Sequence, residues 1–148
     1  MSKRIQPHQF YIIPLVILTI DRILKILALN GVTAKNSIFN FILLKNTGVS
    51  WGLFQGNNIA LLFLSIAIVG AIIFFYKELA VQKLATHFIL IGAISNIIDR
   101  ITFGFIVDYI DFGFFPVFNL ADACISLGGI VLIIYFLFNL NTENNKKK

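Results

Sequence analysis

The stretch that decides the fold is residues 92–128, which read GAISNIIDRITFGFIVDYIDFGFFPVFNLADACISLG. Four of the seven acidic residues of the chain lie there, although the chain as a whole is 58% hydrophobic. These four are Asp99, Asp108, Asp111 and Asp122. Carboxylates are unfavourable near hydrocarbon, so acids gathered at one edge of a membrane protein indicate a functional site. The amides of Asn96 and Asn119 beside them favour water-activating hydrolysis over packing.

Length and composition predict one integral-membrane domain covering residues 1–148. The mean hydropathy is +0.88, and only 13% of the residues are charged. A helix that crosses a bilayer needs ~20 mostly apolar residues. Four stretches meet this requirement, and we expect membrane spans at about 10–29, 59–76, 81–98 and 119–140.

Lysine and arginine predict how these spans are oriented, because cytoplasmic loops are enriched in both. Four spans place both termini on one side, and seven of the twelve basic residues fall there. The other five are Arg22, Lys25, Lys35, Lys45 and Arg100. The bias predicts cytoplasmic termini. Five of the seven acids then share the extracytoplasmic half: Asp21, Asp99, Asp108, Asp111 and Asp122.

Charge and residue content argue against other classes. The net charge of +5 includes the lysine run 146–148, typical of a tail near anionic lipid, so we expect no nucleic-acid partner. His8 and His87 lack partners at metal-ligand spacing, so we expect no metal and no other cofactor. The single cysteine, Cys124, is interpreted as a packing residue. No small-residue cleavage site follows the first apolar run, which ends at Asp21, so we interpret it as an uncleaved span.

Two segments, about 30–58 and 99–118, do not fit a membrane span. The first contains SIFNFILL at 37–44, whose aromatic and β-branched residues favour a strand. Trp51 suits a platform lying at the membrane interface. Glycines every fourth residue over 48–56 match the spacing of dimerising helices, but the polar residues among them argue against that role.

The start of the last span carries two polar residues that a helix places on one face, Asn119 and Asp122. Asn119 is also a good N-cap, and an acid in the first turn suits the helix dipole, so a purely structural role for Asp122 is an equal alternative. Asp99 is expected to end the third span, where its charge opposes the dipole. It therefore needs a cation, such as Lys25 or Arg22.

The remaining acids differ in their surroundings. Asp21 and Lys25 are four residues apart with the acid first, which favours a helical ion pair that is more often structural than catalytic. Asp108 lies in an apolar run, where ordinary loop solvation does not explain it. Asp111, close to Gly113, fits a turn or an interfacial charge.

Spacing alone does not select the reacting pair among these acids, but the chemistry of such a pair can be stated. Two carboxylates in one site cannot both ionise easily, so one keeps a proton. The ionised acid takes a proton from water while the protonated acid polarises the scissile carbonyl. This is an aspartic-protease mechanism. A serine or cysteine nucleophile would need a histidine base, and His8 and His87 both fall on the cytoplasmic half.

Taken in order, the motifs resemble the bacterial lipoprotein signal peptidases, the type II signal peptidase family. The resemblance covers nearly the whole chain in five blocks: DRILK at 21–25, NTG at 46–48, NIIDR at 96–100, GFIVD at 104–108 and FPVFNLAD at 115–122. Each block is weak alone. Their order, the chain length and four spans make the combination specific.

The resemblance implies roles by position. Asp108 and Asp122 match the catalytic pair. The supporting or substrate-binding positions are Asn96, Asp99, Arg100, Asn119, Asn46, Asp21 and Lys25. It also implies a small extracytoplasmic β-cradle and a short extracytoplasmic helix within 31–58. The expected fold class is therefore a mainly α membrane protein with four transmembrane helices and this small β unit.

The same resemblance implies the reaction and its setting. The substrate would be a diacylglyceryl-modified prolipoprotein, cut just before the lipidated cysteine. Apart from the resemblance, we expect a monomer surrounded by membrane lipid. The enzyme would lie in the bacterial cytoplasmic membrane, with its active site at the extracytoplasmic face. Ser95, Lys45 and the VSW run at 49–51 depart from the family pattern, which bears on substrate fit and not on the reaction.

Two readings from other classes stay open at the level of sequence. A small proton-coupled transporter would need an acid near the bilayer midplane, and only Asp21 is approximately that deep. A non-catalytic membrane scaffold would use the glycine spacing near Gly48. Such a scaffold leaves the arrangement of Asp108 and Asp122 unexplained.

Overall fold

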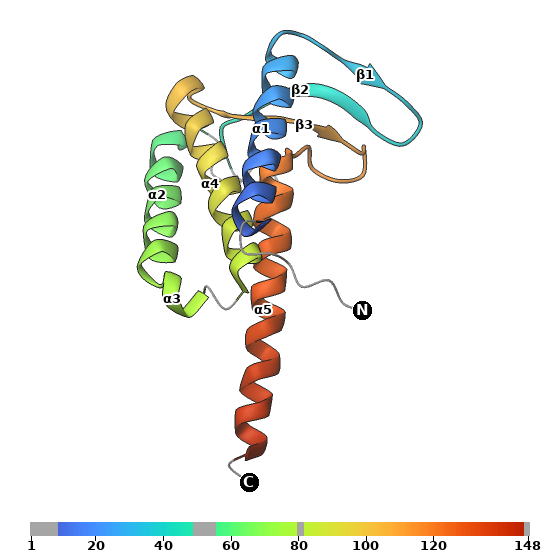
Figure 1. Cartoon of the computed structure of the whole chain (residues 1–148). Helices are drawn as coiled ribbons and strands as arrows, with labels where there is room; N and C mark the ends of the chain where they lie inside the picture. Colours follow the sequence, from blue (N-terminus) through green and yellow to red (C-terminus); the bar gives the residue numbers. More distant parts are fainter. Residues whose placement is uncertain (1–8, 49–55, 80–81, 147–148) are drawn as a thin grey trace.

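The computed structural model describes residues 9–48, 56–79 and 82–146 (Figure 1). These residues form a mostly helical protein with one small antiparallel sheet, which confirms the mainly α class with a β unit. The elements in chain order are α1 (Gln9–Leu29), β1 (Ala34–Lys35), β2 (Asn40–Asn46), α2 (Asn58–Phe74), α3 (Tyr76–Leu79), α4 (Lys83–Phe103), β3 (Ile106–Asp111) and α5 (Leu120–Lys146).

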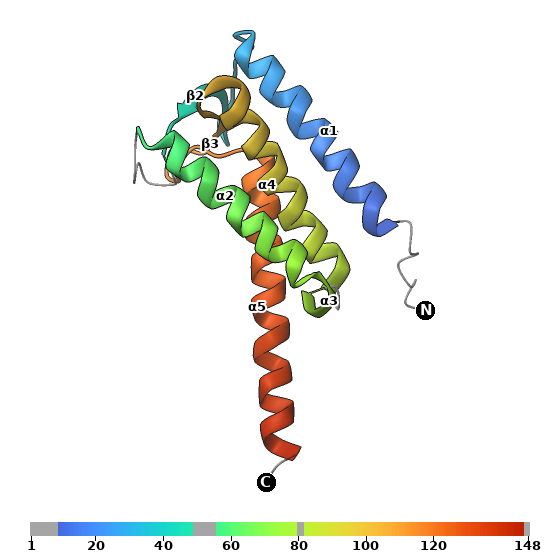
Figure 2. The same ribbon diagram turned by 90° about the vertical axis from the view of Figure 1, so that its left-hand side faces the viewer.

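Helix α4 is the centre of the helical part, and the other long helices pack against it. Helices α1 and α2 flank it on opposite sides in Figure 2, and α5 packs along it as well. Two glycines make the contact with α5 close. A Cβ at Gly92 would collide with the carbonyl oxygen of Ala121, and a Cβ at Gly128 would lie 2.6 Å from the carbonyl oxygen of Ala85. Gly92 therefore lets the first turn of α5 lie against the middle of α4, and Gly128 lets α5 lie close to the start of α4.

Helix length bears on which elements can cross a membrane. Helices α1 and α4 have 21 residues each, so each is about 31 Å long, close to the hydrocarbon thickness of a bilayer. By length and composition, α4 and residues 120–139 of α5 are suited to crossing a membrane. Helix α2 is apolar but has 17 residues, and α1 carries Asp21, Arg22 and Lys25 in its second half. The four expected spans thus correspond to four helices, of which two meet both criteria.

Helix α4 continues beyond residue 98, where the expected span ends, to Phe103. Gly104 ends the helix, because its left-handed φ of 77° turns the chain and its N–H bonds to the carbonyl of Arg100. Asp99 therefore lies inside the helix and not at its end, contrary to expectation. It is buried, and its charge is met by partners from other elements.

The strands are ordered β1–β2–β3, and both pairings are antiparallel. The register sets Leu44 opposite Asp108 and Asn46 opposite Ile106, so Asn46 is a diagonal neighbour of Asp108. Strand β2 confirms the strand expected within 37–44. Strand β3 lies in a segment where no strand was expected.

The sheet is joined to the helices by a small buried apolar cluster of Ala28, Val107 and Tyr109. One member comes from α1 and two from β3, so the strand is fixed against the first helix. The described residues between 31 and 48 form strands and turns. Residues 49–55, which include Trp51, lie outside the described residues, and the short helix expected within 31–58 stays a prediction.

Candidate active site

The two acids matched to the reacting pair lie on consecutive elements, β3 and α5. Asp108 is fully buried in the strand, and Asp122 is partly buried in the first turn of the helix. The chain between them folds back on itself. The N–H of Ile110 donates to the carbonyl of Phe118 at 2.8 Å, and the N–H of Phe118 donates to the carbonyl of Ile110 at 3.1 Å. This pairing brings the start of α5 beside β3.

Amide groups supply a donor to each of the four carboxylate oxygens. On Asp108, Asn46 Nδ2 donates to Oδ2 at 2.8 Å and Asn119 Nδ2 donates to Oδ1 at 2.7 Å. On Asp122, Asn96 Nδ2 donates to Oδ1 at 2.7 Å and the backbone N–H of Asn119 donates to Oδ2 at 3.2 Å. Asn119 therefore contacts both acids and brings them into one site.

The orientation of each amide is fixed by a donor on its oxygen. Asn96 Oδ1 accepts from Lys25 Nζ at 2.9 Å, and Asn46 Oδ1 accepts from the N–H of Gly48 at 2.9 Å. Asn119 Oδ1 accepts from the backbone N–H of Asp122 at 2.8 Å, which confirms its N-cap role. Because these partners can only donate, reversing any amide would set donor against donor. The three Nδ2 groups therefore point at the acids.

The electrostatics of the pair favour a shared proton. Burial and the negative charge of Asp122 raise the pKa of Asp108 to about 7, although the amides of Asn46 and Asn119 favour its charged form. A coupled pair of this kind titrates as a unit. The pair therefore takes up a shared proton as the pH falls through about 7.

A second pair of acids, Asp21 and Asp99, is neutralised by cations. Lys25 Nζ lies 3.1 Å from Asp21 Oδ2 and 2.7 Å from Asp99 Oδ2, and Arg22 pairs with Asp99 Oδ1. Asp21, Lys25 and Asp99 are all buried. Two negative and two positive charges balance, as buried charges require. The expected pairings of Asp21 with Lys25, and of Asp99 with Lys25 or Arg22, are confirmed.

The charged cluster is also bonded to strand β3, which carries Asp108. Asp99 Oδ2 accepts from the N–H of Val107 at 3.1 Å, and Asp21 Oδ1 accepts from the Tyr109 hydroxyl at 2.9 Å. Tyr109 was not among the site residues predicted from the sequence. Its hydroxyl meets a partner 88 residues away, which no local pattern indicates.

Ser95 was singled out only as a departure from the family pattern. Its hydroxyl donates to Asp21 Oδ2 at 2.5 Å and accepts from Lys25 Nζ at 3.2 Å, so it belongs to the charged cluster. The available signal was its position directly before Asn96, on a helix that carries buried polar residues.

Arg100 and Asp111 lie outside both acid pairs. Arg100 Nη2 donates to the carbonyl of Gly48 at 3.1 Å and Nη1 to Ser65 Oγ at 3.3 Å, whereas its Nε has no partner among the described residues. Arg100 thus holds the chain just after β2. Asp111 Oδ1 accepts from the N–H of Gly113 at 2.7 Å, which makes it a turn residue.

Chemically, the amide-bound pair offers an ionised carboxylate as a base and a protonated carboxylate as an acid within one site. In the part of the chain that the structure describes, no three His, Cys, Asp or Glu side chains are grouped so that they could hold a metal ion.

Sequence comparison decides the family. A family model described as signal peptidase (SPase) II matches residues 13–138, which is most of the chain. The chain belongs to the signal peptidase II family. A lipoprotein signal peptidase of Halothermothrix orenii is 31% identical over 134 residues, which cover 84% of this chain and 92% of that protein. A lipoprotein signal peptidase of Staphylococcus aureus (strain JH9) is 37% identical over 112 residues, which cover 70% of this chain and 68% of that protein.

Solved structures place this member of the signal peptidase II family among membrane enzymes. A bacterial membrane enzyme determined by the in meso method at 2.3 Å resolution has a TM-score of 0.81 and 27% identity, covering 100% of this chain and 98% of that chain. A second such enzyme, at 1.9 Å resolution, has a TM-score of 0.75 and 26% identity, covering 93% and 97%. The family expected from the sequence motifs is confirmed.

Proposed function

We propose that Asp108 and Asp122 are the catalytic dyad with which this signal peptidase II removes signal peptides from prolipoproteins. The observation that carries the proposal is the position of Asn119, which donates from its side chain to Asp108 and from its backbone to Asp122. Both acids lie in a buried setting with amide donors, and among the described residues no cation forms a salt bridge with either acid.

The reaction follows from one proton on the pair. The ionised carboxylate takes a proton from water as the water oxygen attacks the scissile carbonyl. The protonated carboxylate gives its proton to the carbonyl oxygen, and a tetrahedral intermediate forms. As the C–N bond breaks, one carboxyl group gives its proton to the departing amine and the other carboxylate takes a proton from a hydroxyl of the intermediate, which becomes the product carboxyl group. The pair again holds one proton.

The supporting residues act by holding the dyad in place. Asn46 and Asn119 hold Asp108, and Asn96 holds Asp122. Lys25 stands behind Asn96 and fixes its amide, so it acts on the dyad through that residue. Asp21 and Asp99 form ion pairs with this buried lysine, and Arg100 holds the carbonyl of Gly48 just after β2.

The depth of the dyad in the helices supports a lipid-bearing substrate. The first turn of α5, which carries Asp122, packs at Gly92. From Gly92, α4 runs on to Phe103, about 16 Å further. With α4 across the bilayer, the dyad lies below the outer end of the helix, at the depth of acyl chains. A prolipoprotein whose cysteine carries diacylglycerol presents the bond before that cysteine at this depth.

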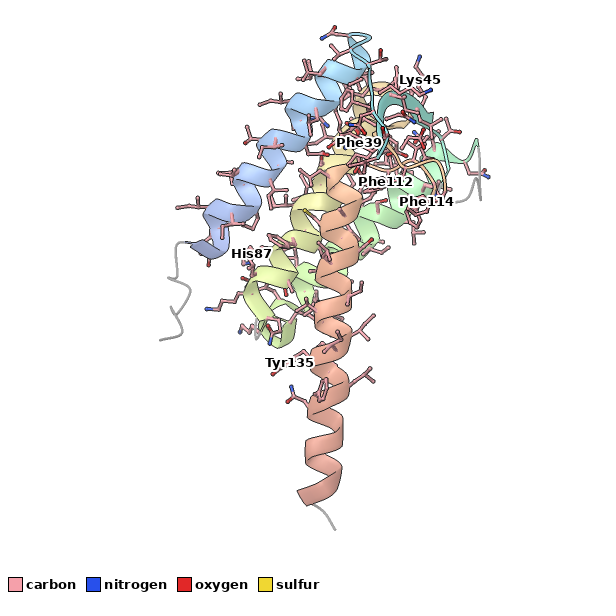
Figure 3. The ribbon with its side chains drawn as sticks, turned by 90° about the vertical axis from the view of Figure 1, so that its right-hand side faces the viewer. Phe39, Lys45, His87, Phe112, Phe114 and Tyr135 are labelled. Carbon is pink, nitrogen blue, oxygen red and sulfur yellow. The ribbon has the colours of Figure 1, made fainter. Side chains whose placement is uncertain are left out.

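We further propose that α1, α2, α4 and α5 cross the bacterial cytoplasmic membrane. Both termini are then cytoplasmic, and the dyad faces the extracytoplasmic side. The lysine and arginine bias supports this orientation. Figure 3 shows Phe39, Phe112 and Phe114 together at the sheet end, with His87 and Tyr135 toward the other end. Phe114 is 85% exposed, and exposed aromatic side chains suit a membrane interface.

We also propose that the enzyme works as a monomer surrounded by membrane lipid. Large apolar side chains are exposed on the helices, including Leu15 on α1, Phe63 on α2 and Ile133 on α5. Lipid contact accounts for these side chains without a second protein chain.

The test is cleavage of a diacylglyceryl-modified prolipoprotein by purified enzyme in detergent. Asp108→Asn and Asp122→Asn keep the size of the side chain and remove the ionisable group, so each should lower kcat by about 10³-fold or more. Asp111→Asn, the same change on the same strand, should leave kcat within about twofold. A folded Asp108→Asn or Asp122→Asn enzyme with more than a tenth of the wild-type rate would show that the dyad is misassigned.

A further inference from the structure

Tyr109 joins the two elements that carry the proposed dyad. It follows Asp108 on β3, and its hydroxyl accepts from the N–H of Leu120, the first residue of α5, at 3.1 Å. The same hydroxyl donates to Asp21 Oδ1 at 2.9 Å. We propose that Tyr109 is a positioning residue whose hydroxyl sets the separation of Asp108 and Asp122. This inference rests on the proposed function.

The start of α5 depends on donors and acceptors outside the helix. The first amides of any helix lack intrahelical partners. Here the N–H of Leu120 meets the Tyr109 hydroxyl, and the N–H of Ala121 meets Asp21 Oδ1 at 3.2 Å. Both groups also bond to each other. The first turn of α5, and with it Asp122, is therefore held by a closed set of bonds to β3 and α1.

Asp21, which accepts from Tyr109 and Ala121, is itself held in place by other side chains. Its Oδ2 accepts from Ser95 at 2.5 Å and lies 3.1 Å from Lys25 Nζ, so the carboxylate is held on both oxygens. Burial and the charge of Asp21 raise the pKa of Tyr109, so the hydroxyl stays protonated and keeps donating. The Tyr109 hydroxyl thus donates one hydrogen bond, to Asp21, and accepts one, from the N–H of Leu120.

Tyr109 acts at a distance from the chemistry. Successive side chains of a strand point to opposite faces, so Tyr109 and Asp108 project away from each other. The ring packs in the apolar cluster with Ala28 and Val107, and a phenylalanine would fill the same space. A phenylalanine would lose the bonds of the hydroxyl to Leu120 and Asp21 and keep the packing of the ring. Removal of the hydroxyl therefore separates a positioning role from a packing role.

The experiment compares Tyr109→Phe with wild type and with Tyr135→Phe, a control on the far part of α5, using the diacylglyceryl-modified prolipoprotein. We expect Tyr109→Phe to lower kcat about tenfold with KM within about twofold. The bell-shaped curve of kcat against pH should also narrow by about half a pH unit, because the two apparent pKa values of the dyad move closer together. They do so because carboxylates that lie further apart repel each other less.

The charged groups that act on the dyad stay the same in this variant, so the width of the bell reports the separation of the acids. They are Lys25 and Asp21 from α1 and Arg100 from α4. A Tyr109→Phe enzyme that melts earlier but keeps the wild-type kcat and bell width would overturn the inference, because the hydroxyl would then only stabilise the fold.

A second variant covers the case in which Tyr109→Phe does not fold. Leu120→Pro removes the N–H that bonds to the hydroxyl, at the first helical position, where proline is tolerated. Leu120→Pro should narrow the curve of kcat against pH in the same way, and a curve of unchanged width would overturn the inference. Failure of the proposed function looks different: wild type does not cleave, or Asp108→Asn and Asp122→Asn keep their activity.

Discussion

Two pairs of aspartates lie in the interior of this protein, and their neighbours differ in kind. Within residues 9–48, 56–79 and 82–146, the hydrogen bonds that Asp108 and Asp122 receive all come from amide groups. Asp21 and Asp99 are matched by Lys25 and Arg22. An acid beside a cation is held ionised, whereas an acid beside neutral donors and another acid can carry a proton. The difference in counter-charge therefore separates a pair suited to proton transfer from a pair suited to holding the fold.

Removing the shared cation should have the largest effect, because it breaks the balance of the charged pair. In Lys25→Met, the buried Asp21 loses its salt bridge, and Asp99 keeps the one with Arg22. Breaking a buried ion pair destabilises a protein by about 3–5 kcal/mol. We expect a loss of that size in the free energy of unfolding in detergent. The control is Lys35→Met on the exposed strand β1, where a comparable loss would contradict the assignment of the effect to burial.

The amide-bound pair should make stability depend on pH in the opposite sense to an ion pair. Asp108 has a pKa raised from 3.8 to about 7, so the native state binds more protons than the unfolded state between these values. Its contribution is fully present below pH 3.8 and is lost as pH rises through about 7. The loss amounts to up to about 4 kcal/mol.

This pH dependence is measured by thermal unfolding of wild type and Asp108→Asn between pH 4 and pH 8 in one detergent. The wild-type stability should fall more steeply than that of the variant. Equal slopes would mean that Asp108 does not carry the raised pKa.

The spacing of the dyad can be tested without touching an acid. In Gly92→Ala, the new methyl meets the carbonyl oxygen of Ala121, next to Asp122, so the first turn of α5 must shift. Overpacking of this kind destabilises by about 1–3 kcal/mol. We expect kcat to fall about tenfold or more. Gly129→Ala is the matched control, because a Cβ there meets nothing within 4 Å.

The sequence predicted the features that depend on local patterns and missed those that depend on contacts between distant residues. Long apolar runs predicted α1, α2, α4 and α5, and the SIFNFILL run predicted part of β2. Strand β3 was missed because its acids mask its apolar pattern and its partner strand lies far away in the sequence. The family motifs named the acids, but the hydroxyls of Ser95 and Tyr109 meet Asp21 across 74 and 88 residues, which local patterns cannot indicate.

The smallest expected effect tests whether neutral donors tune the amide-bound pair. In Asn46→Ala, Asp108 loses a hydrogen bond that favours its charged form, so its pKa should rise further. The alkaline limb of kcat/KM against pH should then move up by about half a unit, which corresponds to about 0.7 kcal/mol. The control is Asn40→Ala, since Asn40 donates to Asp111 on the same pair of strands, 3.2 Å away. If the alkaline limb shifts equally in Asn40→Ala, or does not shift in Asn46→Ala, the amide of Asn46 positions Asp108 without setting its proton affinity.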